Sequence, residues 1–302
     1  MLLSKLNVHP RDNHITFDPA LHRYTITRDG APETAPVSVT SFSKAYFSQF
    51  DAAAVIEERY EVWKLKTNHK YYPLIHSVLS QGGADEDAKQ AIAQLWETAG
   101  DEASKAGTAM HERFEHVCNG AEAVADTEND SKEVELLLRW RREFQPDMGW
   151  EPYRTEWMLW WEEPRLCGAI LVAGTLDLLM RSSVTGQYAL VDFKRTNPAP
   201  KYRGAPPFLL GCGNPRFHPG YALSPINELE NSKFGSYCMQ LNILAKMLRE
   251  RYDIDVQDHM YLLQVHSDMD AAHCVGVPVM RQATNSVFVI EAEKRRAATE
   301  SE

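Results

Sequence analysis

Two short apolar runs separated by a turn constrain the fold of this chain more than any other feature. Residues 172–180 and 188–194 are rich in strand-forming side chains, and residues 182–186 between them have the small residues and the glycine of a hairpin turn. The pattern predicts an antiparallel hairpin. Asp177 and Asp192 are equidistant from the middle of the turn, so we expect them to face each other with Cβ atoms roughly 5 Å apart.

A lysine extends this acidic pair. Asp192 and Lys194 are two positions apart and project from the same face of their strand, so one face is expected to carry Asp177, Asp192 and Lys194. Two carboxylates in apolar surroundings need a cation or a proton between them. Such oxygen ligands suit Mg²⁺ or Mn²⁺, which also bind phosphate oxygens. With an ammonium to orient water or offset charge, the set is typical of phosphodiester hydrolysis, although an isolated Asp-x-Lys also occurs as a solvated strand face.

Composition limits the class of protein. The chain has 302 residues, 44% hydrophobic and 25% charged, which is typical of a soluble globular protein with one large core or two modest ones. No run of about 18 apolar residues predicts a membrane span. Five scattered cysteines without a C-x-x-C pair predict reduced thiols, an intracellular setting and no iron–sulfur cluster. Because the net charge is −10, a nucleic-acid enzyme of this composition needs a local basic groove and a metal.

A helix with a histidine precedes the hairpin. In residues 107–117, Met110 and Phe114 lie on an apolar stripe, while His111 and Glu115 are partners one turn apart on a neighbouring face. Glu115 stands where a zinc protease of the H-E-x-x-H type has its second histidine, which excludes that class. The histidine is therefore either a structural residue or a ligand.

Further segments surround these motifs. Residues 14–17, 22–26 and 153–161 are predicted strands, and Glu156 in the last is either a third carboxylate or part of a cross-strand salt bridge. The proline-rich segment 196–231 is predicted to cover a site. The basic residues next to the expected metal, where a phosphate backbone would lie, are Arg195, Lys201 and Arg203. Residues 233–252 form a predicted helix that carries Tyr237 and Gln240.

The N-terminal half contains aromatic and basic residues whose role the sequence leaves open. Residues 60–85 interleave the two types and either follow a phosphate backbone or form an exposed helix and loop. From Glu86 the pattern is helical, with interruptions expected at Gly100 and Gly107. The aromatics that either stack on bases or pack in a core are Tyr46, Phe47 and Phe50.

In this order the elements resemble the PD-(D/E)XK phosphodiesterase superfamily, specifically its RecB-like exonuclease branch. The resemblance covers about residues 96–266. The four elements that carry it are Gly107-Thr108-Ala109-Met110-His111-Glu112-Arg113-Phe114-Glu115, Gly174-Thr175-Leu176-Asp177, Asp192-Phe193-Lys194 and Tyr237-Cys238-Met239-Gln240-Leu241. Leu176 departs from the nominal signature, which has proline there, and Arg195 departs from the threonine or serine that often follows the lysine.

The resemblance implies specific roles. His111, Asp177, Asp192 and the backbone carbonyl of Phe193 would bind the metal, and Lys194 would position the attacking water. Other residues implied to act at the site are Gln240 and Tyr237, which line it and contact the scissile strand or Lys194, and Glu115, which matches a glutamate common in the family.

Together these inferences define one expected fold and function. We expect a mixed α/β protein whose mixed central sheet is flanked by helices, a restriction-endonuclease-like core with an N-terminal helical addition. The expected divisions are an extension over 1–95, a nuclease core over 96–290 and a charged tail over 291–302. The expected activity is that of a Mg²⁺- or Mn²⁺-dependent DNA nuclease, an exonuclease on single-stranded or processed DNA ends. The alternatives are a catalytically silent nucleic-acid-binding or assembly protein on the same fold, and a nuclease of RNA or branched DNA.

Overall fold

The computed structural model describes residues 2–27, 36–121, 126–163, 170–196, 220–256 and 258–299. The chain divides into two compact units. The larger unit joins Met1–Ser48 to Met110–Glu302, and the smaller unit is Gln49–Ala109. Among the helices of the described ranges, none has the length and apolarity that crossing a membrane requires.

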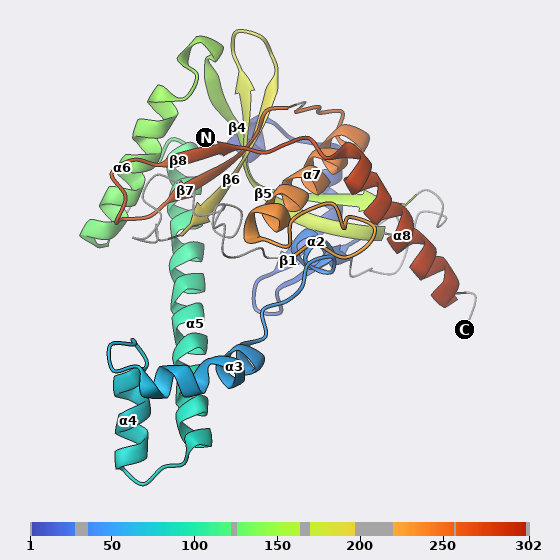
Figure 1. The fold of residues 1–302 in the computed structure, drawn as a ribbon. Coiled ribbons are helices and arrows are strands. Elements are labelled where there is room, and N and C mark those ends of the chain that lie inside the picture. Colours follow the sequence, from blue (N-terminus) through green and yellow to red (C-terminus); the bar gives the residue numbers. More distant parts are fainter. Residues whose placement is uncertain are drawn as a thin grey trace. The chain divides into compact units, whose positions relative to one another are not determined.

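Six strands form a mixed sheet in the described part of the larger unit (Figure 1). Its hydrogen-bonded order is β3-β5-β6-β7-β8, and β4 pairs with β5. The strands are β3 (Val37–Ser38), β4 (Trp150–Glu162), β5 (Ile170–Ser182), β6 (Tyr188–Arg195), β7 (Met260–Val265) and β8 (His273–Gly276). The β3/β5 and β6/β7 pairs are parallel and the other pairs are antiparallel. The expectation of a mixed central sheet flanked by helices is confirmed.

The predicted hairpin is formed by β5 and β6, in the predicted register. Arg181 pairs with Tyr188 and Leu178 pairs with Val191, which is the last pair before Asp177 and Asp192. The turn closes where Gly186 N–H donates to the Ser182 carbonyl, at 2.9 Å. Gly186 has a φ of +75°, a backbone conformation that glycine adopts without a steric penalty.

Helices cover both faces of the sheet (Figure 1). On one face, α2 (Val39–Lys44), α7 (Lys233–Arg251) and α8 (Arg281–Thr299) share a core with side chains of β4, β5, β6 and β7. On the other face, the Met110–Cys118 part of α5 (Asp85–Cys118) and α6 (Glu128–Glu143) pack on β5, β6 and β7. Met110 and Phe114 are fully buried there, which confirms the predicted stripe and fixes the helix that carries His111.

The N-terminal segment packs on the sheet. It contains α1 (Leu3–Leu6), the 3₁₀ helix η1 (Pro10–His14) and a two-stranded sheet of β1 (Ile15–Asp18) and β2 (Arg23–Ile26). Asp12 of η1 accepts hydrogen bonds from Arg154, at 2.9 Å, and from the indole of Trp157, at 2.7 Å. Residues 1–48 therefore belong to the larger unit, whereas the sequence assigned them to an extension.

The smaller unit is helical. It comprises α3 (Ala52–Leu65), α4 (Tyr72–Ser80) and the first part of α5, around a core that includes Tyr60, Ile75 and Ile92. Helix α5 is continuous through Gly100 and Gly107, so the expected interruptions do not occur. Each glycine disfavours a helix by only about 1 kcal/mol, which a long helix anchored in two cores tolerates. The expected boundary at residue 95 consequently lies inside α5.

Three further expectations meet the structure as follows. Tyr46 and Phe47 are buried and pack in the core, whereas Phe50 is 71% exposed. Residues 291–299, expected to be a charged tail, continue α8, because Phe288 and Ala292 are buried against the core. The first part of the proline-rich segment, residues 197–219, lies outside the described residues and includes Lys201 and Arg203.

Candidate metal centre

The expected site lies where the β5/β6 ladder ends. Beyond the Leu178–Val191 pair, Asp177 Oδ2 accepts the backbone N–H of Phe193, at 2.6 Å. His111, from α5, brings its Nε2 to 3.1 Å from the carbonyl oxygen of Phe193. Both backbone polar groups of Phe193 thus contact predicted site residues, and helix α5 is joined to the hairpin at this point.

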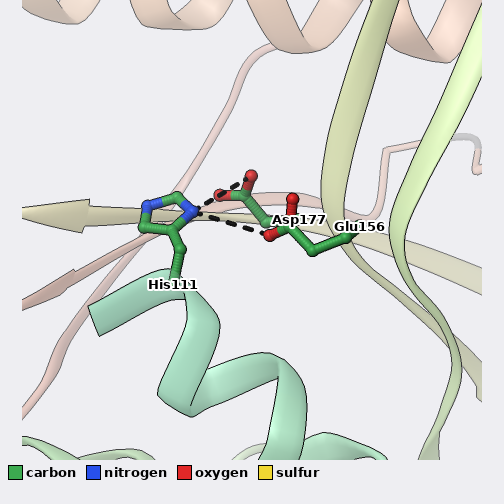
Figure 2. Close-up of side chains that lie close together, drawn as sticks. All are labelled: His111, Glu156 and Asp177. Carbon is green, nitrogen blue, oxygen red and sulfur yellow. Dashed lines mark ion pairs between the residues drawn. The ribbon is translucent and has the colours of Figure 1, made fainter. Parts of the chain in front are cut away.

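Three side chains converge from three elements (Figure 2). His111 Nδ1 is 3.5 Å from Asp177 Oδ1 on β5 and 3.7 Å from Glu156 Oε1 on β4. One potential ligand atom from each residue lies within 4.8 Å of the others. The sequence left Glu156 open as a third carboxylate or a salt-bridge residue, and the structure brings it into contact distance of His111.

The backbone of β4 is irregular at Glu156, the third residue of this cluster. In β4, Thr155 pairs with Leu178 and Trp157 pairs with Leu176, so Glu156 lies opposite Asp177. Its φ is +42°, in the left-handed region that costs a residue with a side chain on the order of 1 kcal/mol. This strained conformation occurs at a residue of the candidate site.

Asp192 and Lys194 form a second group. They share a face, as predicted, and an ion pair joins Lys194 Nζ to Asp192 Oδ2. Lys194 Nζ also lies 4.6 Å from the ring centroid of Tyr237 on α7. Asp177, which the sequence grouped with Asp192 and Lys194, instead contacts His111 and the backbone of Phe193. Asp192 is buried, and the Lys194 ammonium is the partner of its Oδ2.

Burial and charge shift the pKa values of both groups. Burial raises the pKa of Asp192 to about 6. Burial opposes the charge of His111, but Asp177 and Glu156 outweigh it and raise the pKa of the imidazole to about 11. Burial likewise disfavours the Lys194 ammonium, yet Asp192 and Asp177 raise its pKa. The protein without a metal therefore balances its buried carboxylates with an imidazolium and an ammonium.

This donor set fits one divalent cation. A metal with bonds of about 2.1 Å draws oxygen and nitrogen ligands to separations that the His111, Glu156 and Asp177 cluster already approaches. The buried carboxylate of Asp192, which is paired with Lys194, stands outside this group of three. Two carboxylates and one imidazole are a set of side chains that could hold a metal ion.

The remaining predicted residues lie in different environments. Gln240 on α7 has its amide nitrogen 3.5 Å from Thr40 Oγ1. Arg195 Nε donates to Oε1 of the buried Glu133, at 2.9 Å, so its guanidinium is bound within the protein. Sequence reasoning missed Glu133, because a glutamate in an amphipathic helix gives no sign of being buried.

The fold and the site define a mixed α/β protein with a candidate centre for a metal ion. No protein-family model matches the sequence, and comparison with curated proteins finds no similar sequence. Comparison with solved structures finds 14 similar chains. One is described as "Crystal structure of SSO0001", with a TM-score of 0.28 and 14% sequence identity over 54% of this chain and 58% of that chain.

Proposed function

We propose that the chain is a metal-dependent nuclease of the PD-(D/E)XK type that hydrolyses DNA, as an exonuclease on single-stranded or processed ends. The observation that supports this most is the approach of His111, Glu156 and Asp177 to one another beside the Asp192–Lys194 ion pair. Carboxylates, an imidazole and an ammonium in this combination meet the requirements of phosphodiester hydrolysis.

The residues have distinct roles in this proposal. His111, Glu156, Asp177 and Asp192 would hold the cation. The carbonyl of Phe193 faces His111 Nε2, at the edge of the ring opposite the carboxylates, so it would orient the imidazole and would not be a ligand. A bound Mg²⁺ or Mn²⁺ supplies a Lewis acid for the phosphate and makes water more acidic. Lys194 donates a hydrogen bond to the attacking water or to a phosphate oxygen, where its charge offsets the charge that develops in the transition state. Tyr237 keeps the ammonium in place through its ring.

Purified full-length protein tests the proposal. It is incubated with end-labelled linear DNA and with circular DNA, single-stranded and duplex, in the presence of Mg²⁺, Mn²⁺ or EDTA. We expect metal-dependent loss of linear single strands and survival of circles. Asp192→Asn and Lys194→Met are expected to lower the rate at least a hundredfold. Asp147→Asn, at an exposed site in η2 (Pro146–Met148), is the matched control and is expected to cleave normally.

Two other outcomes would favour the alternatives. If the wild type cleaves nothing and calorimetry detects no Mn²⁺ binding, a catalytically silent binding or assembly protein explains the fold better. The net charge of −10 is the observation that favours this alternative. If RNA or branched DNA is cleaved faster than linear single-stranded DNA, the substrate class changes while the metal chemistry remains.

A further inference from the structure

The small β1/β2 sheet reaches the candidate metal centre. The hydroxyl of Tyr24 on β2 lies 2.9 Å from Oγ1 of Thr175 on β5. Thr175 and Asp177 are two positions apart on the same strand and project to the same side, roughly 7 Å from each other. Burial chiefly raises the pKa of Tyr24, and the nearby carboxylates of Glu156 and Asp177 raise it further. Tyr24 is therefore a neighbour of the site contributed by the N-terminal segment.

Aromatic side chains continue from Tyr24 along this sheet. Phe17 on β1 is the cross-strand partner of Tyr24, and their ring centroids are 4.7 Å apart. His22, in the turn, lies 5.3 Å from Phe17, edge to face. Phe17 and Tyr24 are half-buried and His22 is exposed. The three rings form a row that begins beside the metal centre and ends at the surface.

The sheet that carries this row is firmly anchored. Ile15 and Ile26, the next cross-strand pair on the same face, are buried in a cluster with Trp160 of β4 and Ala173 of β5. Tyr24, which packs against this cluster and bonds Thr175, is consequently held in place on β5, and Phe17 packs on Tyr24. Aromatic rings beside the candidate metal centre are side chains on which unpaired bases stack.

We propose that Phe17, His22 and Tyr24 form a stacking platform for the bases of a single-stranded nucleic acid whose scissile phosphate lies at the metal centre. For the identity of its ligand this inference rests on the proposed function. Bases in a duplex have their faces covered by their neighbours, so the platform selects single strands or frayed ends. Every base has such a face, so the selection does not depend on sequence.

Binding without turnover tests the platform. The anisotropy of fluorescein-labelled oligo(dT) is measured with the full chain in EDTA at low salt, where nothing can be hydrolysed by a metal-dependent route. One lost stacking contact weakens binding roughly 5- to 150-fold. We expect Phe17→Leu and His22→Ala to weaken oligo(dT) binding by about tenfold each. Leu21→Ala is the matched control, because Leu21 is 63% exposed in the same turn and has no ring.

Crosslinking locates the contact independently of the variants. Irradiation of a 5-iododeoxyuridine oligonucleotide bound to the wild type is expected to link bases to Phe17, His22 or Tyr24, as read by mass spectrometry. If Phe17→Leu fails to fold, the His22→Ala variant, at an exposed position, and the crosslinks still show whether bases stack on the platform.

Three results would overturn the platform: crosslinks confined to other segments, wild-type affinity in both variants, or an oligo(dT) affinity no higher than that for blunt duplex. In the second case the rings only stabilise the small sheet. If the platform binds oligo(dT) but metal ions produce no cleavage, the proposed function fails and the platform stands.

Discussion

The side chain of Arg195 binds the buried carboxylate of Glu133, with 2.9 Å between Nε and Oε1. Arg113 of α5 approaches the other oxygen of Glu133, at 3.5 Å, and also pairs with Asp130, at 2.5 Å. A single carboxylate on α6 thus contacts the helix that carries His111 and the strand that carries Lys194. Arg195 therefore joins β6 to α6, and through Glu133 to Arg113 of α5.

Removing Arg195 is expected to destabilise the protein. Glu133 is 1% exposed, so Arg195→Met leaves its charge buried with only the longer contact to Arg113. Breaking a buried pair in this way lowers the free energy of unfolding by about 3 kcal/mol, as measured by urea denaturation. Arg281→Met is the control, since Arg281 and Asp255 are 56% and 44% exposed, and it is expected to change stability by less than about 1 kcal/mol. Equal losses in both variants would contradict this account.

Gly174 permits the close approach of α2 to β5. A Cβ atom at this position would lie 2.5 Å from Val39 Cγ2 and 2.8 Å from Val39 Cβ. Gly174→Ala is therefore expected to lower the free energy of unfolding by about 1–3 kcal/mol, and Val39→Ala in the same chain should restore part of the loss. Gly276→Ala, where the added atom meets nothing within 4 Å, is the control and should leave the unfolding midpoint unchanged or slightly higher. A loss in Gly174→Ala no larger than the change in Gly276→Ala would contradict this account.

The hairpin could be predicted because the turn fixes the register of a two-stranded ladder. Counting residues from the turn is sufficient to obtain the register from Arg181–Tyr188 to Leu178–Val191, the last pair before Asp177 and Asp192. The apolar stripe of Met110 and Phe114 predicted which face of their helix packs on the sheet. These two inferences needed only local geometry, whereas the role of His111 at the site was implied by the resemblance alone.

Other features depend on long-range packing that the sequence does not reveal. The exact direction of Glu156 depends on a single residue with a positive φ in a strand of 13 residues. The boundary of the helical unit could not be located, because α5 runs through it as one helix of 34 residues. The burial of Glu133 depends on arginines from two other elements. In each case, the deciding partner is distant in the sequence.

Replacing Glu156 is expected to change stability and metal affinity in opposite directions. Glu156→Gly removes the left-handed strain and a half-buried carboxylate, so the metal-free protein is expected to gain about 1 kcal/mol of stability. The same change removes a proposed ligand and is expected to weaken Mn²⁺ binding at least tenfold by calorimetry. Asp253→Gly, at a φ of +56° on the surface, is the control that relieves similar strain without affecting Mn²⁺ binding. Unchanged Mn²⁺ affinity in Glu156→Gly would exclude Glu156 as a ligand.

Metal binding is expected to displace a proton from His111. Its pKa of about 11 lies above the ordinary 6.5, so in the metal-free protein the imidazolium stabilises the fold fully below pH 6.5, and this stabilisation is lost as the pH rises toward 11. A histidine binds a metal only when neutral. Asp192, with a pKa of about 6, is already ionised above that pH. Between these two values, the Mg²⁺ affinity should therefore rise roughly tenfold for each pH unit.

Calorimetry in buffers of different ionisation enthalpy measures this proton directly. At pH 8, wild-type protein is expected to release about one proton for each Mg²⁺ bound, and the affinity measured from pH 7 to pH 9 should follow the same slope. His111→Gln keeps a neutral donor at the end of the side chain but has no proton to lose, so it should bind Mg²⁺ with no proton release and little pH dependence. Proton release that persists in His111→Gln would mean that another group gives up the proton, and His111 would then be a structural partner of Asp177.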